Sequence, residues 1–210
     1  DQLKSLGVSA DWSRTRFTMD PDYSRDVLNA FVHYYQKGLI YRGLRTVNWC
    51  PRCMTSLSEL ELEYENEKTT MYYIKYGPLT LATVRPVTKF GDTALAVHPD
   101  DKRYKNYIGE NLEIDSLGIN GSVDKPTLTK IKLVVVADKK VDQKFGTGVI
   151  KVTPAHDTTD FEIGERHNLP MVQVIDENGR MNKSAGKYTG MKIKEAREKI
   201  VSDLKTVGLI

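Results

Sequence analysis

The sequence lacks three features that would place it in a specialised class. It contains only 2 Cys among 210 residues, far fewer than a disulfide scaffold carries. No apolar run approaches the ~18 residues that a membrane-spanning helix needs, and the longest clear run covers residues 133–137. The chain begins at Asp1 with neither an initiator Met nor a signal-peptide pattern, so we expect a piece of a longer protein.

The composition that is present is typical of a globular domain. Hydrophobic residues make up 40% and charged residues 28%, close to the average. A chain of 210 residues forms one or two domains and buries a core without disulfides. Its formal net charge of +3, from 31 Lys/Arg and 28 Asp/Glu, is too small to indicate nucleic-acid binding by itself.

The residue pattern of the chain changes near residue 70, and we expect a domain boundary there. Residues 1–70 are predicted to form a helical stem followed by a knuckle that carries both Cys residues. Asp20 is predicted to cap a helix with Pro21 at its first position, because apolar residues then recur at helical spacing. Polar and apolar residues alternate over 58–64, which predicts a strand.

Residues 71–210 are predicted to form a β-rich α/β domain. Gly, Pro, Asn and Asp punctuate short β-like runs, as turns require. The predicted strands are 71–76, 79–84, 93–97, 132–137, 149–153 and 171–175, and the predicted helices are 159–167 and 192–207. This order predicts a mixed sheet or a partly closed β-barrel with peripheral helices.

Cys50 and Cys53 form a Cys-x-x-Cys pair, a spacing that suits one edge of a tetrahedral zinc site. Zinc needs four ligands, and no second pair follows. Three interpretations therefore stay open: half of a zinc site completed by further chain, a redox pair, or two structural thiols. A redox pair usually lies at a helix N-terminus, whereas a strand is predicted here. Two unpaired thiols indicate a reducing compartment, so we expect a cytoplasmic protein.

The first concentration of reactive side chains follows the strand predicted at 79–84. The Arg85–Pro86 step forces the chain out of regular structure and presents Arg85, Thr88 and Lys89 at a strand end. Binding sites are common at such places. The alternative is a solvated loop whose Arg pairs with a nearby acid.

The second concentration spans residues 145–160. Gly146 and Gly148 allow a ligand to approach the backbone closely. Lys151 and Thr153 share one face of the strand predicted at 149–153, because side chains alternate along a strand. A Lys and a Thr on an otherwise apolar strand are not expected in a core.

Three polar residues follow that strand. Asp157 and Asp160 stand three residues apart around a helix start, so both can point to one side. Asp157 either caps this helix or joins Asp160 in binding a ligand. His156 is either a structural histidine or a ligand contact.

These groups together predict a hydrophilic pocket for a ligand that carries an ammonium and a hydroxyl. The carboxylates would bind the ammonium, and the Lys and Thr side chains the hydroxyl. The sequence shows no plausible Ser/His/Asp or Cys/His nucleophile set, and its 4 His residues lack metal-ligand spacing. Hydrolysis in this pocket would use a positioned water and no covalent intermediate.

Four stretches of the sequence resemble the connective-peptide editing region of valyl-tRNA synthetases, and the resemblance runs from residue 1 to 210. The stretches are residues 11–19, 47–53, 85–86 with 91–99, and 146–160, the last continued by 166–170. Lys151 and Thr153 match the valyl pattern, whereas the isoleucyl and leucyl patterns carry other residues there. The resemblance implies a hydrolase that removes threonine mistakenly attached to tRNA(Val).

The resemblance also implies a role for individual residues. Asp160 should bind the α-ammonium of the substrate, and Phe145 should pack beside the terminal adenosine of the tRNA. The implied catalytic residues are Lys151, Asp157 and Asp160, and the implied substrate-binding residues are Arg85, Thr88, Thr83, Phe145, Thr153 and His156.

The implied partner is the acceptor end of tRNA(Val) carrying threonine. We expect a monomer that has no membrane partner and needs no cofactor for editing. No His-x-Gly-His or Lys-Met-Ser-Lys-Ser signature occurs, so no aminoacylation is expected from this chain. In the family a second Cys pair lies beyond the editing insert, so Cys50 and Cys53 are expected to be an empty half of a zinc site.

One departure from the family pattern concerns Val87. The family usually reads Thr-Thr-Arg-Pro-Glu-Thr, and this chain reads Thr-Val-Arg-Pro-Val-Thr at residues 83–88. Val87 thus replaces an acid that we expect beside the pocket, which predicts weakened editing. The alternative functions are a non-catalytic module that binds a tRNA acceptor end, and a structural insert with impaired editing owing to Val87.

Overall fold

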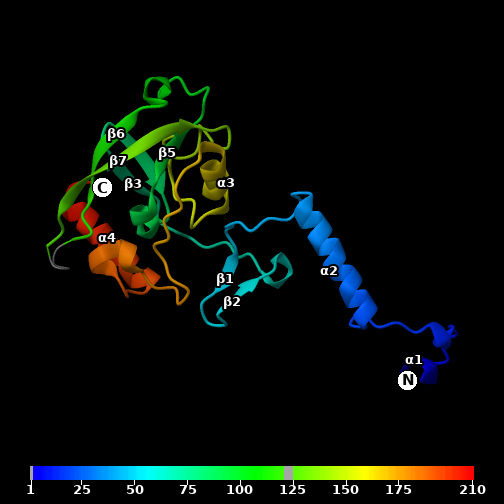
Figure 1. Ribbon diagram of the computed structural model, residues 1–210. Helices are drawn as coiled ribbons and strands as arrows, with labels where there is room; N and C mark the ends of the chain where they lie inside the picture. Colours follow the sequence, from blue (N-terminus) through cyan, green and yellow to red (C-terminus); the bar gives the residue numbers. More distant parts are fainter. Residues whose placement is uncertain (1, 121–124) are drawn as a thin grey trace. The chain divides into compact units, whose positions relative to one another are not determined.

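A computed structural model describes residues 2–120 and 125–210, which divide into two compact units, Asp1–Leu44 and Arg45–Ile210 (Figure 1). The predicted domain boundary near residue 70 stays a prediction, because compactness is not the same property as independent folding. No described helix is long and apolar enough to cross a bilayer.

The first unit is helical. It contains α1 (Gln2–Ser5), the 3-10 helix η1 (Trp12–Arg14) and α2 (Pro21–Gln36). The predicted helix after Asp20 is confirmed, with Pro21 at its first position. No described side chain of this unit is buried, so the unit has no core of its own. Its predicted role as a stem stays a prediction.

The second unit begins with a short hairpin of β1 (Asn48–Cys50) and β2 (Thr55–Leu57). The strand predicted at 58–64 is wrong, because the chain forms the 3-10 helix η2 (Glu59–Glu61) there. The Ser58 backbone N–H donates to Glu61 Oε2 at 2.7 Å, and this capping box competes with strand pairing. Trp49 Nε1 donates to the Glu177 carbonyl at 2.8 Å and ties the hairpin to a distant loop.

The main sheet has four strands in the order β6-β7-β5-β8 (Figure 1). Its strands are β5 (Ala94–Val97), β6 (Asn111–Leu117), β7 (Leu128–Ala137) and β8 (Val149–Val152). β5 and β7 run parallel and the other pairs antiparallel, so the predicted mixed sheet is confirmed. The described strands do not close into a barrel, since β6 and β8 each have one paired neighbour.

A separate hairpin joins β3 (Tyr72–Tyr76) to β4 (Leu79–Thr83), and β4 lies next to β8. The predicted helices are confirmed as α3 (Thr158–His167), which lies along β8, and α4 (Ile193–Thr206). Further 3-10 helices are η3 (Pro86–Gly91), η4 (Lys105–Tyr107) and η5 (Lys183–Tyr188).

The core occupies both faces of the main sheet. On β5, Leu95 and Val97 join a larger apolar cluster that includes Ile200 of α4. Ala94 and Ala96 join a smaller cluster that includes Ile163 of α3. The split follows from the alternation of side chains along a strand. β4 and α3 both contact β8, so these three elements lie together at one edge of the sheet.

Two predicted features of the sheet differ from the structure. The segment 171–175 is not a strand, and only Ile175 forms a bridge, with Met181. Its backbone instead passes close to Gly91, where a Cβ atom would stand 2.7 Å from the Val172 carbonyl oxygen. β6 was not predicted, although its polar and apolar residues alternate as they do in a half-buried strand.

Candidate functional site

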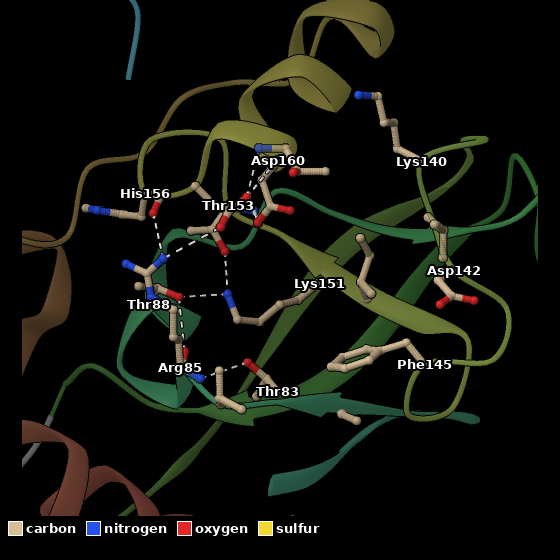
Figure 2. A pocket seen from close by; sticks show the side chains of 16 residues that line it. Thr83, Arg85, Thr88, Lys140, Asp142, Phe145, Lys151, Thr153, His156 and Asp160 are labelled. Carbon is tan, nitrogen blue, oxygen red and sulfur yellow. Dashed lines mark hydrogen bonds and ion pairs between the residues drawn. The ribbon is translucent and has the colours of Figure 1, made fainter. Parts of the chain in front are cut away.

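A cavity of about 430 Å³ opens between the end of β4, η3, β8 and the start of α3 (Figure 2). The nine site residues predicted from the sequence all line it: Thr83, Arg85, Thr88, Phe145, Lys151, Thr153, His156, Asp157 and Asp160. Figure 2 shows Arg85, Thr88 and His156 on one side and Phe145 and Asp142 on the other. Residues up to 77 positions apart are thereby gathered in one pocket.

Lys151 and Thr153 form the polar floor of the pocket. The Lys151 side chain is 8% exposed, and its Nζ donates to Thr88 Oγ1 at 2.7 Å and to Thr153 Oγ1 at 2.5 Å. The sequence excluded these residues from a core, whereas the structure buries both. Burial is tolerated because every buried polar atom named here has a partner.

Asp92 is the residue of this network that the sequence analysis missed. Its side chain is fully buried behind the floor, and Oδ1 accepts from Lys151 Nζ at 3.2 Å and from Thr153 Oγ1 at 3.0 Å. Oδ2 accepts from Tyr76 OH at 2.5 Å. The signal in the sequence was an acid directly after Gly91, inside a stretch that carries the family resemblance.

The two acids at the start of α3 have different tasks. Asp157 caps the helix, because its Oδ1 accepts from the backbone N–H groups of Thr159 and Asp160 at 2.9 and 3.1 Å. Asp160 Oδ2 accepts the Thr153 backbone N–H at 2.8 Å. Burial, together with the charges of Asp157 and Asp92, raises the pKa of Asp160 to about 6. Asp160 is therefore mostly ionised at pH 7.

Arg85 links the two segments that the sequence singled out. Its backbone N–H donates to Thr83 Oγ1 at 3.1 Å, which fixes the chain where β4 ends. Its guanidinium donates to the His156 carbonyl at 3.0 Å and lies 3.7 Å from Asp157 Oδ2. The side chain is about half exposed, so this ion pair contributes little to stability and mainly orients the Arg over the pocket.

The His156 side chain is neutral, and its hydrogen bond holds a neighbouring backbone segment in place. Burial, with the positive charges of Arg85 and Lys151, lowers its pKa to about 4. Its Nε2 accepts the Val174 backbone N–H at 2.8 Å, which leaves the ring proton on Nδ1. The ring lines the pocket while holding the segment that follows α3.

Phe145 presents an aromatic face at the rim of the pocket and is 53% exposed. Its loop is held from one side by Arg103, whose guanidinium donates to the Gln143 carbonyl at 2.9 Å. Tyr104 OH donates to the Thr147 carbonyl at 2.8 Å. The exposed ring therefore stands on a fixed loop, as a stacking surface requires.

Val87 does not line the cavity. Its side chain is 2% exposed and packs in the larger apolar cluster of the core. The expectation that this position stands beside the pocket is wrong for this chain. A Glu at position 87 would place a carboxylate in apolar surroundings, at a large cost in stability unless it found a partner.

Cys50 and Cys53 are free thiols at the end of β1 and in the turn that follows. The Cys53 backbone N–H donates to Cys50 Sγ at 3.4 Å, and this contact lowers the pKa of Cys50. The described residues contain no group of three or more His, Cys, Asp or Glu placed to hold a metal. They supply two of the four ligands that zinc requires. A turn and the strand β2 follow the pair directly, so the pair does not stand at a helix N-terminus as a redox pair usually does.

Two protein families match parts of the chain. The family described as tRNA synthetases class I (I, L, M and V) matches residues 1–119, and the leucyl-tRNA synthetase editing domain matches residues 118–205. The chain belongs to the class I tRNA synthetases of the I, L, M and V group, a family of enzymes.

Individual relatives narrow this family. The chain is similar to proteins named valine–tRNA ligase from Thermotoga maritima, Carboxydothermus hydrogenoformans and Petrotoga mobilis, at 50%, 48% and 49% identity. Each match covers 100% of this chain but only 24%, 23% and 23% of the relative. The resemblance to valyl-tRNA synthetases is thus confirmed, and the chain spans about a quarter of the length of these relatives.

Proposed function

We propose that this chain is the editing region of a valyl-tRNA synthetase and hydrolyses the ester that joins threonine to tRNA(Val). The observation that carries the proposal is the pocket itself, where the half-buried Asp160 carboxylate lines the same cavity as Lys151 and two Thr hydroxyls. The names of the relatives and the editing-domain match support the same assignment.

The need for such a pocket follows from the substrates. Valine and threonine are nearly the same size, and a hydrophobic site rejects the extra hydroxyl of threonine by only ~10²-fold. A second pocket that requires the hydroxyl completes the discrimination. A polar wall of this kind pairs with the hydroxyl of threonine. When valine is bound instead, the polar groups of the wall stay unpaired.

The hydrogen-bond inventory supports recognition of a hydroxyl at the floor. Thr88 Oγ1 donates to the Arg85 carbonyl at 3.1 Å, and Thr153 Oγ1 donates to Asp92. Each oxygen also accepts from Lys151. A hydroxyl oxygen has two lone pairs, so each Thr keeps one acceptor position. The threonyl hydroxyl is therefore bound as a donor.

The reaction needs a water and no covalent intermediate. We infer that Asp160 binds the α-ammonium and that a water attacks the ester carbonyl carbon, breaking the bond to the terminal ribose oxygen. Lys151 supplies positive charge for the carbonyl oxygen as it becomes negative. Asp157 and Arg85 border the attack site, and Phe145 stacks on the terminal adenosine. We infer that the partner is the tRNA acceptor end, and the two free thiols support a reducing compartment such as the cytoplasm.

The deciding experiment compares hydrolysis of Thr-tRNA(Val) and Val-tRNA(Val) by this chain. We expect threonine to be released at least ~10²-fold faster than valine, since the polar floor pairs only with the hydroxyl. Asp160→Ala is expected to abolish the difference. Release of threonine at the rate of the Asp160→Ala variant, with the tRNA still bound, would instead identify a module that only binds acceptor ends.

A further inference from the structure

The buried carboxylate of Asp92 does not line the pocket but contacts the groups that do. Its side chain is 0% exposed, and it accepts hydrogen bonds from Lys151, Thr153 and Tyr76. Removing an ion from water is costly unless such partners compensate it. The site therefore holds a buried carboxylate with three hydrogen-bond partners directly behind its floor.

The hydrogen bonds of Lys151 show what this carboxylate achieves. An ammonium has three N–H donors, and three acceptors take them: Thr88 Oγ1, Thr153 Oγ1 and Asp92 Oδ1. Of these three acceptors only Asp92 carries a charge. These three hydrogen bonds fix the direction of the Lys151 side chain and use all of its N–H donors. Lys151 therefore acts on the substrate through its positive charge.

Asp92 is itself fixed from the opposite side. Tyr76 of β3 is buried, and its OH occupies Asp92 Oδ2, so that Oδ1 turns toward Lys151 and Thr153. Burial and the Asp92 charge raise the pKa of Tyr76, which keeps its hydroxyl a donor. The chain of contacts runs from the hairpin through Asp92 to the pocket floor.

A second buried lysine, Lys89, interacts with both Asp92 and Lys151. Lys89 is buried, and its Nζ lies 3.8 Å from the centroid of the Tyr76 ring. Burial lowers the pKa of Lys89 to about 8, while the charge of Asp92 raises it and the charge of Lys151 lowers it, so the three groups interact. Without Asp92 two buried ammonium groups would repel each other, and Lys151 would move from the floor.

We propose that Asp92 is a positioning residue of this site, which holds the Lys151 ammonium and the Thr153 hydroxyl where the ester carbonyl reacts. This inference rests on the proposed function for its reaction, but the placement of Lys151 can be tested without it.

The chain offers a matched control in Asp203 of α4. Its side chain is also buried, at 3% exposure. It accepts a hydrogen bond from Tyr188 OH at 2.6 Å and forms ion pairs with Lys187 and Lys199 at 3.0 and 3.2 Å. None of these residues lines the pocket. Asp92→Asn and Asp203→Asn therefore remove the same kind of buried carboxylate from two different places.

The first experiment measures kcat and KM for Thr-tRNA(Val) hydrolysis by the two variants of this chain, below their unfolding temperatures. For Asp92→Asn we expect kcat to fall about 10²-fold, as for a misplaced catalytic group. KM should change less than about threefold, because Asp160 and Phe145 remain in place. Asp203→Asn should keep kcat within about threefold. Equal kcat values for the two variants would overturn the proposal.

The second experiment follows the acetylation rate of Lys151 by acetic anhydride, read by mass spectrometry. Loss of the Asp92 carboxylate, the one charged acceptor of the ammonium, should speed the acetylation of Lys151 at least tenfold in Asp92→Asn, and the rate should stay unchanged in Asp203→Asn. The same rate in both variants overturns the proposal. If the wild-type chain fails to hydrolyse Thr-tRNA(Val), the proposed function fails, and acetylation alone still decides whether Asp92 places Lys151.

A milder pair of variants serves if Asp92→Asn does not fold. Tyr76→Phe and Tyr188→Phe each remove one hydroxyl that donates to a buried Asp. We expect kcat to fall several-fold in Tyr76→Phe and faster acetylation of Lys151, with neither change in Tyr188→Phe. Identical behaviour of the two Phe variants in both measurements counts against the proposal.

Discussion

At the scale of the residue, Lys89 shows how a buried charge is tolerated near the pocket. Its Nζ has no hydrogen-bond partner among the described residues and lies over the Tyr76 ring. Burial lowers the pKa of Lys89 to about 8, because it penalises the charged form. The sequence placed this lysine on an accessible strand end, whereas η3 turns it into the core.

Lys89→Met is expected to raise the free energy of unfolding at pH 7, since an apolar side chain of similar length replaces a desolvated cation. The difference should shrink as the pH rises from about 8 to 10.5. In this range the unfolded wild type binds more protons than the folded one, so wild-type stability increases with pH. Urea unfolding of both proteins at pH 7, 8.5 and 10 measures it. A difference that stays constant with pH would show that Lys89 is not desolvated.

Asp160 predicts a pH dependence of ligand binding. Its pKa, raised to about 6 chiefly by burial, means that the carboxylate gains a proton as the pH falls through 6 and loses its attraction for an ammonium. A non-hydrolysable threonyl-adenosine analogue should bind about tenfold more weakly at pH 5 than at pH 7. Calorimetric titration tests this, with Asp160→Asn as the control, whose weaker binding should not depend on pH in this range.

At the scale of the element, α3 couples stability to the site. Its first turn carries Asp157 as the cap, and the cap places Asp160 against the Thr153 backbone N–H. The helix ends at Asn168 in the left-handed conformation, at φ 52°, a common way for a helix to stop. These local signals made α3 predictable from the sequence to within one residue.

Asp157→Ala is expected to reduce the free energy of unfolding by about 1 kcal/mol, because two backbone N–H groups lose their acceptor. Asp157→Asn keeps an acceptor oxygen and should lose less. Glu165→Ala, an exposed change on the same helix, serves as the control in urea unfolding. Equal losses for Asp157→Ala and Glu165→Ala would mean that the cap is not formed.

The sequence predicted the strands less accurately than the long helices. β3, β4, β5, β7 and β8 were recognised from short apolar runs, but β1, β2 and β6 were missed and two strands were predicted where none exists. A strand is stabilised by a neighbour that can lie far along the chain. Residues 58–64 alternate as a strand does, yet no strand of the described residues pairs with them, and Ser58 and Glu61 form a capping box around a short 3-10 helix.

At the scale of the whole molecule, the two units differ in how they are stabilised. The larger unit buries both faces of a mixed sheet, whereas the described residues of the first 44 include no buried side chain. An isolated helix of the length of α2, 16 residues, is marginal in water. The first unit should therefore exchange its amide protons much faster than the main sheet.

Removal of residues 1–44 is expected to change the unfolding temperature of the rest by less than about 2 °C, because little buried apolar area is lost. Calorimetry of the 210-residue chain and the shortened chain measures this shift, and hydrogen exchange of α2 and β5 amides provides an independent check. A fall of more than about 5 °C would show that the first unit contributes to the fold of the second.

The sequence by itself determined the family, the helices α2, α3 and α4 and nine of the side chains that line the pocket, because motif and helix signals are local along the chain. Only the tertiary structure decided how these side chains are held. Asp92 and Lys151 are 59 residues apart in sequence, and Lys89 and Tyr76 join them from other elements. Whether a polar residue is exposed or buried depends on partners that only folding supplies.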